Sequence, residues 1–375
     1  MRTARFCLRA GAIVVFCGPL LVNPVIGGTA AARRGPAAQT GHPSAALVVD
    51  KAGTYKVAQE IGPGSINATN TRWDVYGADL GSMFVYQGRT YMVFGDTFGG
   101  PAANPFFSVS HNNWRSNTMA YIGPGQTPSP GLRFSGMISG PSGAAKELLS
   151  SQKVVGVEQT VIPTYGVAAG NTMYLYYMSV KEFGAPGHWT CNYSGLAYPK
   201  DGGQTWTKDH EATWPGDSNF DQVALVDHTQ FIYVFGIPCG RYGGLEVARV
   251  PQKDVLDTSA YRYWDGKEWT TSLSAAVRVV PAPVGELSVQ WNSYYRKWLM
   301  MYLIDPTGQI VIRTADQLTG PWSGAQVVVT SRQYPELYAP FITPKWDAGP
   351  AIYFNMSMYG PYQVFLMRTS LSSSP

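Results

Sequence analysis

Apolar residues recur along the chain in short runs separated by Gly, Pro and polar turn residues. Five of these runs are similar in length and character, and each is preceded by a shorter apolar run and followed by another strand-like segment. The five runs are GRTYMVFGDTF from residue 88, GNTMYLYYMSV from 170, HTQFIYVFGIP from 228, YRKWLMMYLID from 295 and AGPAIYFNMSM from 348. Three or four strands repeated five times predict an all-β fold, a five-bladed β-propeller. A β-sandwich would need fewer strands and would not explain the recurring order.

Several turns fit hairpins at the rim of such blades. The motif KDGGQTW, which contains Asp201, resembles a D-x-G-x-T-W turn that recurs in hairpins of many carbohydrate-active propellers. Because that turn is structural in those proteins, we assign Asp201 no catalytic role. YRYWDGKEWT and LTGPWS have the same character and predict similar rim hairpins.

The short runs that open the repeats begin near charged or polar residues. In a propeller the first strand of each blade lines the central channel, so the starts of these strands gather at one end of the axis. The starts here are Asp79, Glu158, Asp221, Glu286 and Tyr338. Clustered like charges repel, so four acidic starts at one mouth indicate a function. We expect Glu158 and Asp221 to be solvated rim residues.

The segment DLGSMFVYQGRTYMVFGD, residues 79–96, is almost wholly apolar but has an aspartate at each end. A two-residue turn at Gln87–Gly88 would make Asp79 and Asp96 direct cross-strand neighbours, with Cβ atoms roughly 4.5–5.5 Å apart. Like charges so close should couple, with the pKa of one carboxyl raised and the other left low. Such a pair can supply a proton donor and an ionised carboxylate. The alternative is that Asp96 only caps the GDTFGG turn.

Sugar chemistry fits the other residues expected at this mouth. Glycoside hydrolysis needs two carboxyl groups, hydrogen-bonding groups for hydroxyls and aromatic faces for sugar rings. For substrate binding we predict Arg115, Asn117, Asn192, Arg241, Glu286 and Trp291, with Trp114, Trp189 and Tyr359 as further aromatic platforms. Any of the aromatics could instead pack between blades. Glu286 is a third carboxylate that could act as an acid, a base or a modulator of the aspartate pair.

Composition agrees with a β fold and narrows the choice of partners. Charged residues make up only 14% of the chain, which has 41 Gly and 27 Pro, and this suits short strands and tight turns. The formal net charge of +4 arises at the start, because residues 1–34 hold five Arg and no acid. The rest has 23 basic and 24 acidic residues. A nearly neutral body argues against nucleic acid as the main partner.

The N-terminus has the pattern of an export signal. MRTARFCLR supplies positive charge, AGAIVVFCGPLLVNPVIGG an apolar stretch and TAAARR small residues for cleavage. We therefore predict an export signal at 1–34, a flexible lead-in at 35–65 and the propeller at 66–375, in a protein of the cell envelope or the medium. An uncleaved membrane anchor is the alternative, which Pro19 and Pro24 weaken.

Cysteine usage is consistent with export. Cys7 and Cys17 fall in the signal, which leaves Cys191 and Cys239 for an oxidising compartment, where such a pair suggests a disulfide. The alternative is two buried free thiols. No Cys/His spacing resembles a zinc site and no acidic spacing is specific to Ca²⁺, so we predict no metal and no cofactor. We expect a monomer.

Motifs in matching order from about residue 70 to 370 resemble a known family. They are GADLG, FGDTFGG, WRSNTMAY, VIPT, YMSV, NYSGLAYPKDGGQTW, GELSV, RTADQLTGPWS and YAPFITPKW with IYFNMSMYGPYQVFLMR. The family is the former domain-of-unknown-function family 4185, now glycoside hydrolase family one hundred and eighty-three, the endo-D-arabinanases. The resemblance implies a five-bladed propeller that cuts internal linkages of D-arabinan, the polymer of arabinogalactan and lipoarabinomannan in mycobacterial-type envelopes. It also implies that Asp79 and Asp96 are catalytic.

Other classes of protein fit parts of the sequence. A non-catalytic glycan-binding propeller of the cell envelope would explain the export signal and the aromatics, but not two opposed carboxylates on one hairpin. A sialidase-like enzyme would need a cluster of arginines and a Tyr nucleophile, and the arginines expected at the mouth are too few. A structural or adhesive propeller would be indifferent to Asp79→Asn. Sugar release from D-arabinan, L-arabinan and a sialoside separates these alternatives.

Overall fold

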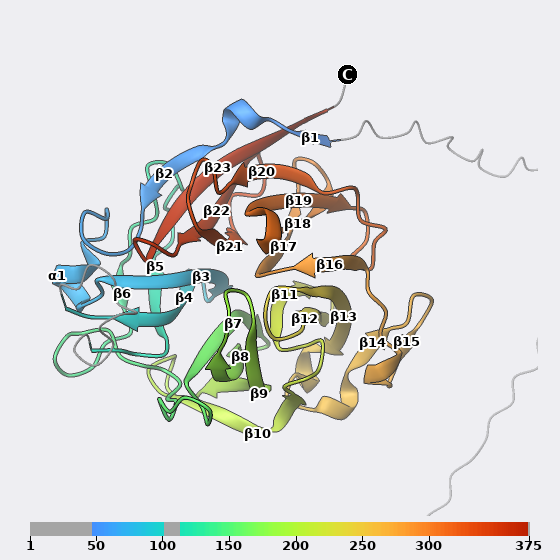
Figure 1. Cartoon of the computed structure of the whole chain (residues 1–375), viewed down its shortest axis with the longest axis horizontal. Helices are drawn as coiled ribbons and strands as arrows, with labels where there is room; N and C mark the ends of the chain where they lie inside the picture. The colour runs from blue at the N-terminus through green and yellow to red at the C-terminus, as the bar shows by residue number, and fades with distance from the viewer. Residues whose placement is uncertain (1–46, 101–112, 374–375) are drawn as a thin grey trace, which may run out of the picture. The chain divides into compact units, whose positions relative to one another are not determined.

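The computed structural model describes residues 47–100 and 113–373, which form a five-bladed β-propeller (Figure 1). Five sheets of antiparallel strands stand around one axis, and the predicted fold class is confirmed. The predicted export signal lies outside the described residues, as does the part of the predicted lead-in before residue 47. Within the described ranges, no helix has the length and apolar character needed to span a bilayer.

The strands of each of the first three sheets are given from the axis of the propeller outwards. The first sheet contains β3 (Gly77–Tyr86), β4 (Arg89–Phe98), β5 (Thr118–Ile122) and β6 (Gly136–Met137). The second contains β7 (Thr160–Ala169), β8 (Thr172–Phe183), β9 (Trp189–Pro199) and β10 (Trp206–Pro215). The third contains β11 (Gln222–His228), β12 (Phe231–Ile237), β13 (Gly243–Pro251), β14 (Arg262–Trp264) and β15 (Trp269–Thr270), with β16 (Val280–Val284) also paired to β13.

The last two sheets complete the ring. The fourth contains β17 (Leu287–Asn292), β18 (Lys297–Ile304), β19 (Gln309–Ala315) and β20 (Gln326–Thr330). The fifth contains β21 (Leu337–Ile342), β22 (Ala351–Met358), β23 (Gln363–Ser373), β1 (Leu47–Val49) and β2 (Tyr55–Gln59). Helix α1 (Thr69–Trp73) and 3₁₀ turns at Lys51–Gly53, Gln252–Asp254, Thr258–Ala260, Leu273–Ala275 and Asp305–Thr307 lie in connections. Strands β3, β7, β11, β17 and β21 contact one another in a ring around the axis.

The turns form where the sequence predicts them. Tyr86 pairs with Arg89 across the Gln87–Gly88 turn, and both turn residues have positive φ values of 46° and 78°, as a type I′ hairpin requires. In the KDGGQTW turn between β9 and β10, the Thr205 backbone N–H donates to Asp201 Oδ1 over 2.6 Å. This hydrogen bond gives Asp201 the structural role that the motif predicts.

The predicted boundary of the propeller at residue 66 is too late. Strands β1 and β2 both pair with β23, so residues 47–59 are part of the fifth sheet and not of a flexible lead-in. Glu60 is fully buried directly after β2, where it accepts hydrogen bonds from Asn67 Nδ2 (2.9 Å) and the Leu132 backbone N–H (3.0 Å). The weak alternation of YKVAQ concealed an edge strand whose partner lies at the other end of the chain.

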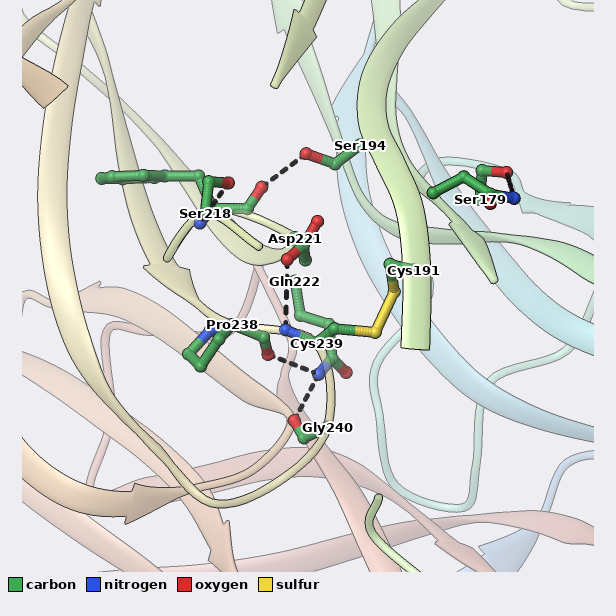
Figure 2. The surroundings of a disulfide bond; sticks show 11 residues. Ser179, Cys191, Ser194, Ser218, Asp221, Gln222, Pro238, Cys239 and Gly240 are labelled. Carbon is green, nitrogen blue, oxygen red and sulfur yellow. Dashed lines mark hydrogen bonds between the residues drawn. A yellow bond between two sulfur atoms is a disulfide. The ribbon is translucent and has the colours of Figure 1, made fainter. Parts of the chain in front are cut away.

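The predicted disulfide joins the second and third sheets. Cys191 on β9 is bonded to Cys239, which follows β12, with an S–S distance of 2.08 Å (Figure 2). The loop at Cys239 has further anchors: its backbone N–H donates to Asp221 Oδ2 over 3.2 Å, and Gln222 Nε2 donates to the Gly240 carbonyl over 2.6 Å. Three independent attachments therefore fix this loop beside the start of β11.

Truncation tests the corrected boundary. A chain that starts at residue 66 lacks β1, β2 and buried Glu60, and it leaves the long strand β23 unpaired along one edge. We expect its thermal midpoint to lie more than about 5 °C below that of a chain starting at residue 45, measured by circular dichroism. Equal thermal midpoints for the two chains would contradict a structural role for β1 and β2 in the fifth sheet.

Candidate active site

A cavity of about 540 Å³ opens at the end of the axis where the first strands of the blades begin. All five first strands contribute to its wall, through residues that include Leu80, Thr164, Gln222, Leu287 and Tyr338. Four of the eight predicted catalytic and binding residues also line this cavity: Asp79, Asp96, Arg241 and Glu286. Propeller geometry therefore gathers them as the sequence predicts.

Asp79 lies deep in the protein with part of its side chain facing the cavity. Tyr338 Oη donates to its Oδ2 over 3.0 Å, and the Tyr362 hydroxyl also hydrogen-bonds the carboxyl. A Cβ at Gly95 would collide with Asp79 Oδ1, so this glycine leaves the room that the carboxyl occupies. Burial, followed by the negative charge of Asp96, raises the Asp79 pKa from 3.8 to about 8. The carboxyl is therefore mostly protonated at neutral pH.

Asp96 is buried on the neighbouring strand β4. Its Oδ1 accepts hydrogen bonds from Trp114 Nε1 (2.8 Å) and Thr160 Oγ1 (2.6 Å), so the alternative that it only caps the GDTFGG turn is wrong. Burial raises its pKa to about 7, although these hydrogen bonds oppose the rise. The prediction that one carboxyl of the pair keeps a low pKa is therefore wrong, because burial raises the pKa of Asp96 as well as that of Asp79.

The hairpin register differs locally from the prediction. Ala78 pairs with Thr97 and Ser82 with Val93, as the turn position requires, but between them Leu80 pairs with Phe94. Leu80 and Gly81 have positive φ values of 65° and 84°, which place an irregularity next to the aspartate. Asp79 and Asp96 are therefore not a regular cross-strand pair. The irregularity changes the direction of the backbone at Leu80 and Gly81, and so changes where the neighbouring Asp79 side chain points.

Arg241 lies between two acidic side chains in the cavity wall. Its Nη2 is 2.8 Å from Glu286 Oε1, its Nε donates to the same oxygen over 2.9 Å, and its Nη1 is 3.1 Å from Asp305 Oδ1. The guanidinium carbon lies 5.0 Å from the centre of the Tyr338 ring. The two carboxylates, mainly Glu286, raise the Arg241 pKa further above its usual range against the effect of burial. Arg241 and Glu286 thus join the third and fourth blades by an ion pair.

Two predicted binding residues are structural instead. Arg115 is buried and donates to the carbonyls of Ala145 (2.9 Å) and Asp74 (2.7 Å), and burial lowers its pKa to about 10. Asn117 uses its whole amide: Nδ2 donates to the carbonyls of Leu149 and Val161 over 2.8 Å each, and Oδ1 accepts from the backbone N–H groups of Leu148 and Leu149. Both residues fasten loops of the first blade and do not face the cavity.

The other two predicted binding residues also lie elsewhere. Asn192 Nδ2 donates to the Val157 carbonyl (2.7 Å) and to Ser179 Oγ (3.2 Å), so it braces the second blade. Trp291 packs against Trp298 at 5.2 Å in a separate depression at the opposite end of the axis. A residue at the far end of an inner strand cannot reach the mouth where that strand begins.

The expectation that Glu158 and Asp221 are solvated is wrong. Both side chains are buried. Glu158 accepts from Ser179 Oγ (2.8 Å) and the Gln152 backbone N–H (3.1 Å). Asp221 holds the Cys239 backbone, and burial raises its pKa to about 7. Both carboxylates therefore form hydrogen bonds that hold neighbouring segments around the mouth in place.

Several cavity residues escaped the sequence analysis. Tyr362 lines the cavity and hydrogen-bonds Asp79, and Thr160 hydrogen-bonds Asp96 from outside the cavity lining. Neither was predicted as a site residue, although Tyr362 lies in the motif IYFNMSMYGPYQVFLMR. The sequence did contain a signal for Asp305: it directly follows β18 in YLID, and Asp96 likewise lies near the end of the second strand of its blade, β4. Of the further aromatic platforms, Trp189 and Tyr359 line the cavity, whereas Trp114 packs on Phe98.

In residues 47–100 and 113–373, no group of three or more His, Cys, Asp or Glu side chains is arranged to hold a metal ion.

Known proteins similar to this chain give a family and a fold. The family model described as "Domain of unknown function (DUF4185)" matches residues 64–368. Notoamide biosynthesis cluster protein J′ of Aspergillus versicolor is 29% identical over 308 residues, which cover 76% of this chain and 81% of that protein. Among solved structures, a protein of Bacteroides ovatus ATCC 8483, provisionally described as a hydrolase, has a TM-score of 0.58 at 14% identity and covers 86% of this chain and 93% of its own.

Zg3597, a family 117 glycoside hydrolase produced by Zobellia galactanivorans, has a TM-score of 0.48 at 12% identity, covering 86% of this chain and 90% of that one. At 14% identity, the likeness to the Bacteroides ovatus structure supports the fold alone.

The buried aspartates should make stability depend on pH. Their pKa values rise from 3.8 to about 8 and about 7 on folding, so between these limits the folded state binds more protons than the unfolded state. The free energy of unfolding therefore falls as pH rises from about 4 to about 8. Asp79→Asn should reduce this fall by more than about 1 kcal/mol, measured by urea denaturation at pH 5 and pH 9.

Exposed Asp316 supplies the control for this measurement. Asp316→Asn is the matched variant, because the Asp316 side chain is 78% exposed and does not line the cavity. Glu60 and Asp221 retain their own raised pKa values in both variants, so the slope decreases without vanishing. An unchanged slope in Asp79→Asn would contradict the raised Asp79 pKa.

Proposed function

Because the chain belongs to the family described as domain of unknown function DUF4185, whose description names no activity, we propose its function from the site. The protein is a glycoside hydrolase that cuts internal linkages of D-arabinan, with Asp79 and Asp96 as its catalytic carboxyls. The single observation that carries the hydrolase proposal is the Asp79 carboxyl, held protonated at neutral pH in a cavity of substrate size beside a second carboxyl.

Each carboxyl has a role that its surroundings support. Asp79 gives its proton to the glycosidic oxygen as the bond between that oxygen and the anomeric carbon breaks. Asp96 acts on the anomeric carbon either as the base that takes a proton from an attacking water or as the nucleophile that bonds the carbon before water releases it. Hydrogen bonds from Trp114 and Thr160 favour the ionised form of Asp96, which both routes require.

The choice of polymer rests on the resemblance to the endo-D-arabinanases. In this chain the motifs GADLG and GDTFG, which carry part of that resemblance, contain Asp79 and Asp96. Trp189 and Tyr359 in the cavity wall offer aromatic faces to sugar rings. We further propose that the protein acts outside the cytoplasm as a monomer, since the Cys191–Cys239 disulfide suits an oxidising compartment.

Digestion of purified arabinogalactan by the chain, Asp79→Asn and Asp96→Asn tests the proposal. We expect the unmodified chain to release arabinose oligosaccharides, and each variant to be slower by about 10²–10⁴-fold because it lacks an acid–base group. L-Arabinan and a sialoside should yield no products. Equal binding of D-arabinan by all three proteins with no release by any of them would instead establish a glycan-binding propeller.

Tyr338→Phe tests the role of Asp79 as the acid. The Tyr338 hydrogen bond stabilises the ionised carboxylate and so lowers the Asp79 pKa, and its removal should raise that pKa. Activity that requires protonated Asp79 is lost as pH rises through this pKa, so the alkaline limb of the kcat/KM profile should move to higher pH. A limb that moves to lower pH or stays in place would contradict the assignment. Tyr294→Phe, at an exposed tyrosine, is the control.

A further inference from the structure

Besides Asp79 Oδ1, two buried polar atoms of residues that line the active-site cavity have no hydrogen-bond partner among the described residues. They are Glu286 Oε2, an acceptor, and Trp189 Nε1, a donor. Both residues line the cavity, and Glu286 as a whole is only 7% exposed. A buried polar atom without a partner is destabilising, so a pair of opposite polarity in a cavity wall indicates a missing ligand group.

Arg241 connects these two residues. Its guanidinium binds Glu286 Oε1 and leaves Oε2 uncommitted, and its Cζ lies 5.4 Å from the centre of the Trp189 ring. Glu286 and Trp189 therefore flank the same guanidinium, although one belongs to the fourth blade and the other to β9 of the second. Arg241 is thus the common neighbour of a carboxylate acceptor and an indole donor in the cavity wall.

The charges around this point determine which ligands fit. Among the described residues of the cavity wall, Arg241 is the one cation, and it is already paired with Glu286 and Asp305. Asp96 and Glu336 add further carboxyls to the wall. A carboxylate or phosphate on a ligand would meet acidic groups and no available cation, whereas an uncharged hydroxyl can both donate to Glu286 and accept from Trp189.

We propose that Glu286 Oε2 and Trp189 Nε1 form a subsite that binds a hydroxyl group, or two neighbouring hydroxyls, of an uncharged sugar residue of the substrate. This subsite rests on the proposed function. It adds residues that position the sugar substrate but take no part in bond cleavage. Arg241 and Asp305 are positioning residues. Arg241 holds the Glu286 carboxylate in place, and Asp305 in turn pairs with Arg241. The two carboxylates together neutralise the guanidinium charge that an acidic ligand would need.

The Arg241 segment is fastened in a way that suits this role. The Arg241 backbone N–H donates to the Gly187 carbonyl over 2.9 Å, two residues before Trp189. Cys239, two residues before Arg241, is tied to β9 through its disulfide and to Asp221 through its backbone (Figure 2). These attachments fix the donor and the guanidinium relative to one another before a ligand arrives, which lowers the entropic cost of binding.

Steady-state hydrolysis of a defined D-arabinofuranosyl oligosaccharide tests the subsite in Glu286→Gln and Trp189→Phe. Glu286→Gln replaces the charged carboxylate acceptor by an uncharged amide of nearly the same size, and Trp189→Phe removes the indole N–H donor but keeps an aromatic ring. We expect KM to rise about tenfold in each variant with kcat little changed, because the lost hydrogen bonds hold the substrate before and during the reaction. Asp316→Asn and Trp291→Phe, at the opposite end of the axis, are matched controls and should keep the KM of the unmodified chain.

The outcomes separate this subsite from the proposed function. Unchanged KM in both variants, while the unmodified chain releases sugar, would overturn the subsite and leave the function standing. A large fall in kcat with unchanged KM in Glu286→Gln would also overturn it, because Glu286 would then act in bond cleavage. Absence of sugar release by the unmodified chain would overturn both. Circular dichroism of each variant confirms that a raised KM does not reflect unfolding.

Discussion

Closure of the ring of sheets is the constraint on which the rest of the structure depends. The fifth sheet takes β21, β22 and β23 from the end of the described chain and β1 and β2 from its beginning. Once the ring is closed, the first and last blades are neighbours, and Tyr338 donates to Asp79 across a separation of 259 positions. The site is therefore a product of closure, because its acid and the hydroxyl that holds it come from opposite ends of the chain.

Closure also forces several carboxyl groups into one cavity, and the protein stabilises them in three different ways. Asp79 keeps its proton, Asp96 accepts two hydrogen bonds on one oxygen, and Glu286 forms an ion pair with Arg241. Each is a recognised means of avoiding an uncompensated buried charge. The differences provide a proton donor, a stabilised carboxylate and a hydroxyl acceptor in one wall, which is the division of labour that hydrolysis of a neutral glycan needs.

The repeat pattern predicted the blades because each blade is built from local strand periodicity and local turns. The same reasoning placed Asp79, Asp96, Arg241 and Glu286 at one mouth, and export chemistry predicted the disulfide. Contacts between distant loops have no such local signal. Nothing in WRSNTMAY distinguishes a ligand-binding Arg115 from one that donates to the Ala145 carbonyl, and an irregularity at Leu80–Gly81 broke a register that sequence symmetry favoured. Burial of whole side chains, and hence both raised pKa values, also depends on packing between blades.

The central claim is that Asp79 carries a proton at neutral pH while it faces the cavity. Carbon-13 NMR of the aspartate carboxyl groups tests it directly, with the Asp79 signal identified by its loss in Asp79→Asn. We expect a titration midpoint near pH 8 for this carboxyl in the unmodified chain. A midpoint near 4, the range of a solvated aspartate, would contradict it.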